Sequence, residues 1–142
     1  MRNVAEIQEK TNGPDHYEID GANIYLLGSQ CSACGAAFYP EQTVCGRCGH
    51  RGSESLRLGP DGILYTWTRV HQSTPEFKTP YVLSYVDFPQ NVRVLVPLVD
   101  NAEPKIGMAV KLVLAPGPKL SHDGQPVELV HVAPVIAKEE QL

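Results

Sequence analysis

Residues 31–49 read CSACGAAFYPEQTVCGRCG and contain all four cysteines of this 142-residue chain. They form two C-x2-C pairs, Cys31 with Cys34 and Cys45 with Cys48, separated by ten residues. Two residues between paired cysteines let the backbone turn so that both sulfurs face one ion, and four thiolates complete a tetrahedral shell. This stretch therefore predicts a small metal-binding ribbon with the four cysteines as ligands.

The residues around the cysteines bear on which metal is bound. A glycine follows each pair, Gly35 and Gly49, and can take the positive φ that turns backbone N–H groups toward sulfur. Both structural zinc and rubredoxin-type iron accept tetrahedral sulfur. We favour zinc, because a closed zinc site stabilises a loop-rich unit by roughly 10–16 kcal/mol, and this ribbon has few apolar residues of its own, mainly Phe38, Tyr39 and Val44. Two disulfides would instead need an oxidising compartment, which nothing in the sequence indicates.

Composition limits the class of protein. The chain has 12 Gly and 12 Pro, which disfavours a helical bundle, and a net charge of -4 without a basic run, which disfavours binding to duplex nucleic acid. No apolar run approaches the roughly 20 residues of a membrane span. Residues 1–10 lack the apolar core of a secretory signal. We therefore expect a cytoplasmic protein without membrane association.

Turn signals and composition divide the chain into four parts. Residues 1–20 are a polar N-terminal segment with a short possible helix at residues 4–9. Residues 21–58 form the ribbon, entered by a strand at residues 24–27. Residues 59–136 form a second domain, and the polar residues 137–142 form a tail that we expect to fray.

The second domain reads as all-β. Five strands are predicted from alternating or β-branched residues between turns, at residues 63–70, 81–88, 92–99, 110–114 and 127–132. The period of two places Ile63, Tyr65 and Trp67 on one face, and Pro97 favours an edge or a bulge. The turn at residues 116–118 ends the fourth strand. Five short strands without a helix predict a mostly β protein, a rubredoxin-like zinc ribbon followed by a five-stranded OB-fold barrel.

No catalytic residue is predicted in this chain. The histidines form no triad with a serine or free cysteine, the four thiols are committed to metal, and no glycine-rich loop resembles a P-loop. His71 ends the first barrel strand, begins a polar loop, and is the candidate for substrate contact. His131 alternates with valines and is predicted to be a half-buried structural residue. Four aromatic residues could stack bases as OB-folds do, but packing is favoured for them: Tyr65, Trp67, Tyr81 and Tyr85.

The succession of these motifs resembles a known family. CSACG, FYP, CGRCG, GILYTWTRVH, PYVLSYVDF and IGMAVKL, spread over residues 21–134, are similar to the rubredoxin-like zinc-ribbon plus OB-fold proteins that accompany acyl-CoA enzymes. Members of that family are accessory subunits that bind thiolases, hydratases or aldolase-like enzymes and supply no nucleophile. A subfamily that also starts shortly before the ribbon is the small subunits of benzoylsuccinyl-CoA thiolases. The resemblance implies zinc ligation by Cys31, Cys34, Cys45 and Cys48.

The resemblance leads to an expected function. We expect a noncatalytic subunit of a hetero-oligomeric thiolase-type enzyme that helps shape an acyl-CoA site at the interface, as in aromatic acyl-CoA degradation. The ribbon and one barrel face would dock on the catalytic chain, with Phe38, Tyr39 and Trp67 as anchors. Two alternatives remain open at this point: a single-stranded nucleic-acid-binding module and a rubredoxin-like electron carrier.

Overall fold

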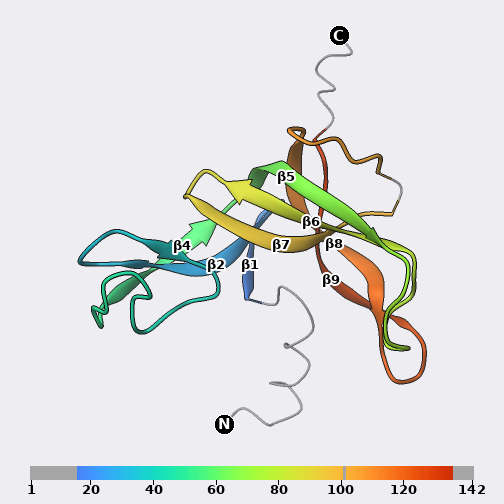
Figure 1. Ribbon diagram of the computed structural model, residues 1–142, viewed down its shortest axis with the longest axis horizontal. Coiled ribbons are helices and arrows are strands. Elements are labelled where there is room, and N and C mark those ends of the chain that lie inside the picture. Colours follow the sequence, from blue (N-terminus) through green and yellow to red (C-terminus); the bar gives the residue numbers. More distant parts are fainter. Residues whose placement is uncertain (1–15, 101, 136–142) are drawn as a thin grey trace.

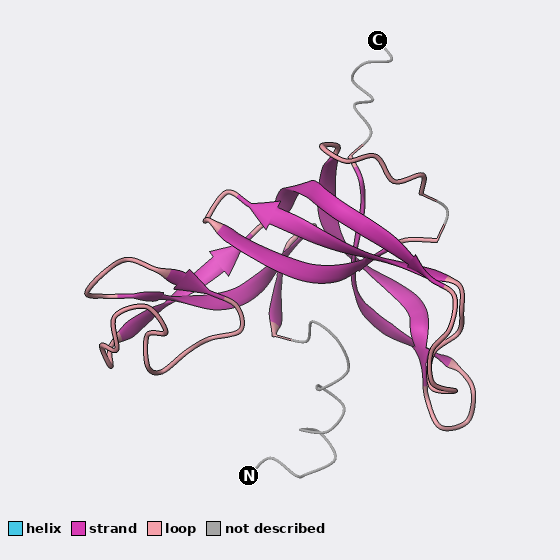
Figure 2. Ribbon diagram, viewed as in Figure 1, coloured by secondary structure: helices cyan, strands magenta, loops and turns pink. Residues whose placement is uncertain are grey.

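The computed structural model describes residues 16–100 and 102–135, which form nine β-strands and no helix (Figures 1 and 2). The helix predicted at residues 4–9 and the tail at residues 137–142 lie outside the described residues. The described part of the chain has no helix of the length and apolarity that crossing a membrane requires.

The first sheet carries the ribbon. Its central strand is β2 (Asn23–Cys31), which includes the predicted strand at residues 24–27 and runs directly into the first cysteine. β4 (Ser53–Leu58) pairs with one edge of β2, and β1 (Tyr17–Asp20) and β3 (Ala37–Phe38) pair with its other edge. β1 and β4 were not predicted as strands, because their exposed polar residues give little apolar alternation.

A cross-strand contact holds β1 in this sheet. Arg57 on β4 extends across β2 and places its guanidinium 4.3 Å from the ring centroid of Tyr25. Its Nη2 atom donates to Glu18 Oε2 at 2.9 Å and to Asp20 Oδ2 at 3.2 Å. Residues 17–20, which composition places in the polar N-terminal segment, thus pair with β2 as a strand and contact a distant arginine as well.

The second sheet is a closed five-stranded barrel, as predicted. Its strands follow the order β5-β6-β7-β9-β8, and every pairing is antiparallel except β7 with β9. This connectivity agrees with the predicted OB-fold. The strands span, in order, Asp61–Val70, Tyr81–Phe88, Val92–Leu98, Ala109–Leu120 and Pro126–Pro134.

Two details of the barrel strands concern prolines. β7 pairs with β9 only at Leu98 opposite Val132, so Pro97 lies where β7 needs few donors on that side. The turn predicted at residues 116–118 is wrong: β8 continues through it to Leu120. The β8–β9 register shifts between Pro116 and Leu120. The residues between them, including Gly117 at φ 68°, form a bulge-like irregularity in β8 and not a turn that ends it.

The face predicted for Trp67 is also wrong. The β5–β6 register shifts between Leu64 and Thr66, and this bulge reverses the alternation of β5. Ile63 and Tyr65 are exposed on the outside of the barrel, whereas Trp67 is half-buried and packs against the core. The prediction failed because a period of two holds only for an uninterrupted ladder.

Ribbon and barrel share one hydrophobic core. Leu26 and Leu58 of the ribbon sheet belong to the same buried cluster as Phe88 and Leu112 of the barrel. Gly59 lies at the junction with φ 99°, and a Cβ there would be 2.8 Å from Leu112 Cδ1. The metal-binding ribbon is therefore packed onto the barrel, a placement also visible in Figure 1.

Candidate metal centre

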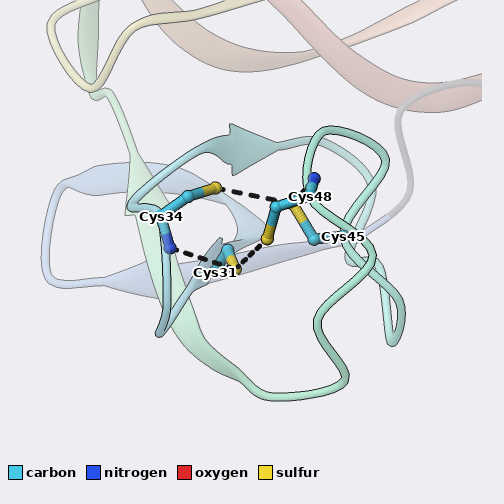
Figure 3. A group of neighbouring side chains, drawn as sticks. All are labelled: Cys31, Cys34, Cys45 and Cys48. Atoms are coloured by element: carbon cyan, nitrogen blue, oxygen red, sulfur yellow. Dashed lines mark hydrogen bonds between the residues drawn. The ribbon is translucent and has the colours of Figure 1, made fainter.

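The fold brings the four cysteines to one point (Figure 3). Their Sγ atoms all lie within 4.8 Å of one another, with Cys31 to Cys48 and Cys34 to Cys45 each at 3.7 Å. A tetrahedral ion with metal–sulfur bonds of about 2.3 Å separates its sulfurs by about 3.8 Å. The four thiols are unbridged. The sulfur atoms therefore fit one tetrahedral metal ion and not two disulfides.

The two halves of the centre are built alike. The backbone N–H groups of Ala33 and Cys34 point at Cys31 Sγ, at 3.4 and 3.5 Å from N to S. In the second half, the N–H groups of Arg47 and Cys48 point at Cys45 Sγ, both at 3.3 Å. These donors spread the negative charge of a thiolate cluster.

A glycine ends the turn in each half of the centre. The N–H of Gly35 donates to Cys31 O at 3.0 Å, and that of Gly49 donates to Cys45 O at 2.9 Å. Their φ values are 80° and 82°, a conformation that residues with a Cβ rarely adopt. The positive φ predicted at both glycines is confirmed.

The electrostatics of the thiols favour metal binding through the first cysteine of each pair. The N–H group of Cys48, followed by that of Arg47, lowers the pKa of Cys45 to about 6 against the effect of burial. The N–H groups of Cys34 and Ala33 lower the pKa of Cys31 in the same way. Cys45 and Cys31 are thus readily available as thiolates, the form that binds metal.

Cys48 behaves differently in the absence of an ion. The backbone of His50 lowers its pKa, but burial and the three neighbouring thiols outweigh that contribution and raise the pKa to about 11. Four thiolates at one point repel each other, so the last proton leaves only when a cation balances the charge. The four thiols are therefore suited to binding a cation, and without one they repel each other as thiolates.

An aromatic residue lies beside the centre. Phe38 lines a small hollow together with Cys31 and Cys45, and its Cε1 would lie 3.7 Å from a Cβ on Gly46. Tyr39 is half-buried and packs against the shared core. Phe38 and Tyr39, two of the three predicted docking anchors, therefore already make packing contacts within the chain and are only partly exposed to a partner.

The other predicted residues do not gather into one site. His71 is exposed at the start of the loop between β5 and β6, and its role stays a prediction. His131 is buried rather than half-buried, and its Nδ1 lies 3.0 Å from Leu129 O. The valines on either side of it, Val130 and Val132, are fully buried in the barrel core. Because His131 alternates with them and is buried too, both faces of β9 are covered at this position.

The aromatic residues do not form a continuous stacking surface. Tyr65 and Tyr85 are exposed on the barrel wall, Trp67 faces the core, and Tyr81 is buried against Phe77 at 5.8 Å between ring centroids. Exposed aliphatic residues beside the two tyrosines were missed, because single apolar residues at outward positions give no recognisable sequence pattern.

The fold and the centre define a class of protein: a four-cysteine rubredoxin-like ribbon joined to an OB-fold barrel. Two family models match the chain, the ChsH2 rubredoxin-like zinc ribbon domain over residues 20–54 and the ChsH2 C-terminal OB-fold domain over residues 57–115. A DUF35 domain-containing scaffold protein of Methanothermobacter thermautotrophicus is 31% identical over 105 residues, 70% of this chain and 78% of that protein. The chain belongs to this DUF35 family.

Further relatives point to enzyme assemblies. The benzoylsuccinyl-CoA thiolase subunit BbsA of Geobacter metallireducens is 29% identical over 117 residues, 80% of this chain and 79% of the relative. Among solved structures, the Ltp2-ChsH2(DUF35) aldolase matches with a TM-score of 0.61 and 25% identity, covering 78% of this chain and 84% of that one.

Proposed function

We propose that this chain is a noncatalytic accessory subunit of a thiolase-type acyl-CoA enzyme. It docks on the catalytic chain and helps shape the acyl-CoA site. The observation that carries the proposal is the similarity to BbsA, which is named as a thiolase subunit and matches most of both chains. The similarity to a DUF35 chain named with an aldolase supports the same kind of assembly.

The site residues support a structural rather than a chemical role. The cysteines of the chain converge on the metal centre, which leaves the catalytic cysteine to the partner. We propose zinc as the ion, because a closed four-thiolate zinc site supplies folding energy without redox chemistry. The unbridged thiols agree with the cytoplasmic location that we propose.

The two alternatives have less support. A nucleic-acid-binding face needs cations that are free to meet phosphates. The chain has a net charge of -4 and no basic run, and two of its arginines are engaged with carboxylates, Arg57 with Glu18 and Asp20 and Arg93 with Asp87. An electron carrier would hold iron, and oxidised iron–thiolate protein is red whereas the zinc form is colourless.

The test is purification from the native cell followed by reconstitution. We expect a thiolase-type catalytic chain to co-purify, colourless protein with about one zinc per ribbon, and thiolase turnover that depends on adding this chain back. Isolation of the chain by itself, together with catalytic turnover that is the same with and without it, would contradict the proposal.

A further inference from the structure

Large apolar side chains are exposed on one part of the barrel. Nine are exposed among the described residues, and the three on the ribbon are Tyr17, Ile19 and Val44. The other six all lie on the outside of the barrel and range from 42% to 69% exposed. We call these six the apolar band: Ile63, Tyr65, Tyr85, Leu95, Ile106 and Val135.

Strand pairing makes the band continuous from β7 to β5. Leu95 on β7 pairs with Tyr85 on β6, and Tyr85 pairs with Thr66 on β5. Thr66 follows Tyr65, the residue at the bulge. The bulge thus places a tyrosine outward beside the other members of the band.

Pairing also extends the band across β8 to the end of β9. Ile63 pairs with Ala109, whose carbonyl accepts a hydrogen bond from Val135 N at 3.0 Å. Gly107 N donates to the carbonyl of Leu64 at 2.8 Å, which holds Ile106 beside β5. Strand pairing therefore brings residues far apart in sequence onto one wall of the barrel, and exposed apolar side chains gathered in this way mark an interaction surface.

One ion pair lies within the band. Arg93 donates to both carboxylate oxygens of Asp87, at 2.6 and 3.0 Å, and its guanidinium lies 3.4 Å from the ring centroid of Tyr65. A partner that covers the band buries a paired charge and not an isolated one. Arg93, the cation at the centre of the band, is thus paired within the chain, which favours an apolar protein surface over a phosphate backbone as the occupant.

We propose that the apolar band is the surface with which this subunit docks on the catalytic chain of its acyl-CoA enzyme. The inference rests on the proposed function and adds the surface to it. Two copies of the chain each carry a net charge of -4, which opposes self-association through the same face. Relatives named as subunits of other enzymes favour a catalytic chain as the occupant. Tyr65, and not Trp67, is then the aromatic anchor of β5.

The test measures the affinity of the full-length chain for the thiolase-type catalytic chain that co-purifies with it. Leu95→Glu and Tyr85→Glu each place a charge in the band, and Ile19→Glu is the matched control on the ribbon, at a residue that is 57% exposed. We expect the two band variants to weaken binding by about tenfold or more and the control to bind like the unaltered chain. Trp67 fluorescence and metal content confirm that each variant is folded.

Hydrogen exchange on the unaltered complex is an independent readout. We expect slower amide exchange at residues 63–65 and 105–108 in the complex than in the free subunit. Band variants that bind as tightly as the unaltered chain, or unchanged exchange in these segments, would overturn the inference while leaving the proposed function standing. If the unaltered chain fails to bind a catalytic chain at all, both are wrong. A dimer that the band variants convert to monomers, with unchanged affinity for the catalytic chain, also overturns it.

Discussion

The guanidinium of Arg93 on β7 crosses β6 and lies 3.4 Å from the ring centroid of Tyr65 on β5. The arginine is held there by Asp87, which accepts two hydrogen bonds from it. Three neighbouring strands thus contribute a cation, an anion and an aromatic ring to one outward cluster. This cluster holds the ring of the exposed tyrosine beside a charge that is already paired.

Removal of Arg93 is expected to affect binding more than folding. Arg93→Ala should hardly change the melting temperature, because the ion pair is exposed and screened by solvent. It should weaken binding of the catalytic chain by about thirtyfold, because Asp87 would be buried without its partner. The double variant Asp87→Ala, Arg93→Ala should bind more tightly than the single variant. Equal affinities of the single variant and the unaltered chain, measured by calorimetry, would show that the pair lies outside the interface.

Metal content should depend on all four thiols. Cys31→Ser or Cys45→Ser should reduce bound zinc from about one ion per chain to nearly none, measured by elemental analysis, because serine does not supply a thiolate. Ser32→Ala is the control: its hydroxyl donates to Gly52 O at 3.0 Å, outside the sulfur shell, and its zinc content should be unchanged. Full zinc occupancy in either cysteine variant would argue against the four-thiolate centre.

Two glycines of the ribbon should tolerate alanine very differently. A Cβ on Gly28 would lie 2.3 Å from the carbonyl oxygen of Phe38, whereas a Cβ on Gly46 would meet Phe38 Cε1 at an ordinary 3.7 Å. Gly28→Ala should therefore reduce the free energy of unfolding by about 1–3 kcal/mol or more, because the strands must separate. Gly46→Ala should be close to neutral. Chemical denaturation compares the two, and similar unfolding free energies would contradict this reading of the β2–β3 contact.

The shared core should couple the unfolding of ribbon and barrel. Leu26 is fully buried in the ribbon sheet, and Leu26→Ala should cost about 2–5 kcal/mol. The chain has one tryptophan, Trp67, which lies in the barrel, so its fluorescence reports on barrel unfolding. We expect metal release and the fluorescence change to shift together in this variant, with Ile19→Ala as the exposed control. Metal release that moves to lower denaturant while the fluorescence transition stays in place would indicate two independent units.

His131 should make the fold sensitive to mild acid. Burial lowers the pKa of His131 from its ordinary 6.5, so the unfolded chain takes up a proton that the folded chain resists. Stability is therefore lost as pH falls below about 6.5, by up to about 1.4 kcal/mol per pH unit until the folded-state pKa is reached. His131→Gln should lose less stability over this range.

The control for acid sensitivity is the exposed His122. His122→Gln should keep the pH dependence of the unaltered chain, followed by denaturation at several pH values with the metal content monitored. The same loss of stability in His131→Gln as in the unaltered chain would remove His131 as the cause.

The sequence by itself determined the metal ribbon and the order of the barrel strands. Cysteine spacing is local, so two turns and their glycines suffice to direct two sulfurs to one ion, and the structure has the same geometry in both pairs. Alternation along Tyr81–Phe88 likewise predicts a strand, because a buried face imposes a period of two on the residues that line it.

Only the tertiary structure decided which residues meet across the strands. The bulge after Leu64 turned Trp67 inward and Tyr65 outward, and a register shift is a property of two paired strands, not of one. Arg57 holds β1 from 37 residues or more away along the chain, and the apolar band joins residues from 63 to 135. Such groupings arise when the barrel closes, because contacts between distant strands carry no periodic signal in the sequence of either strand.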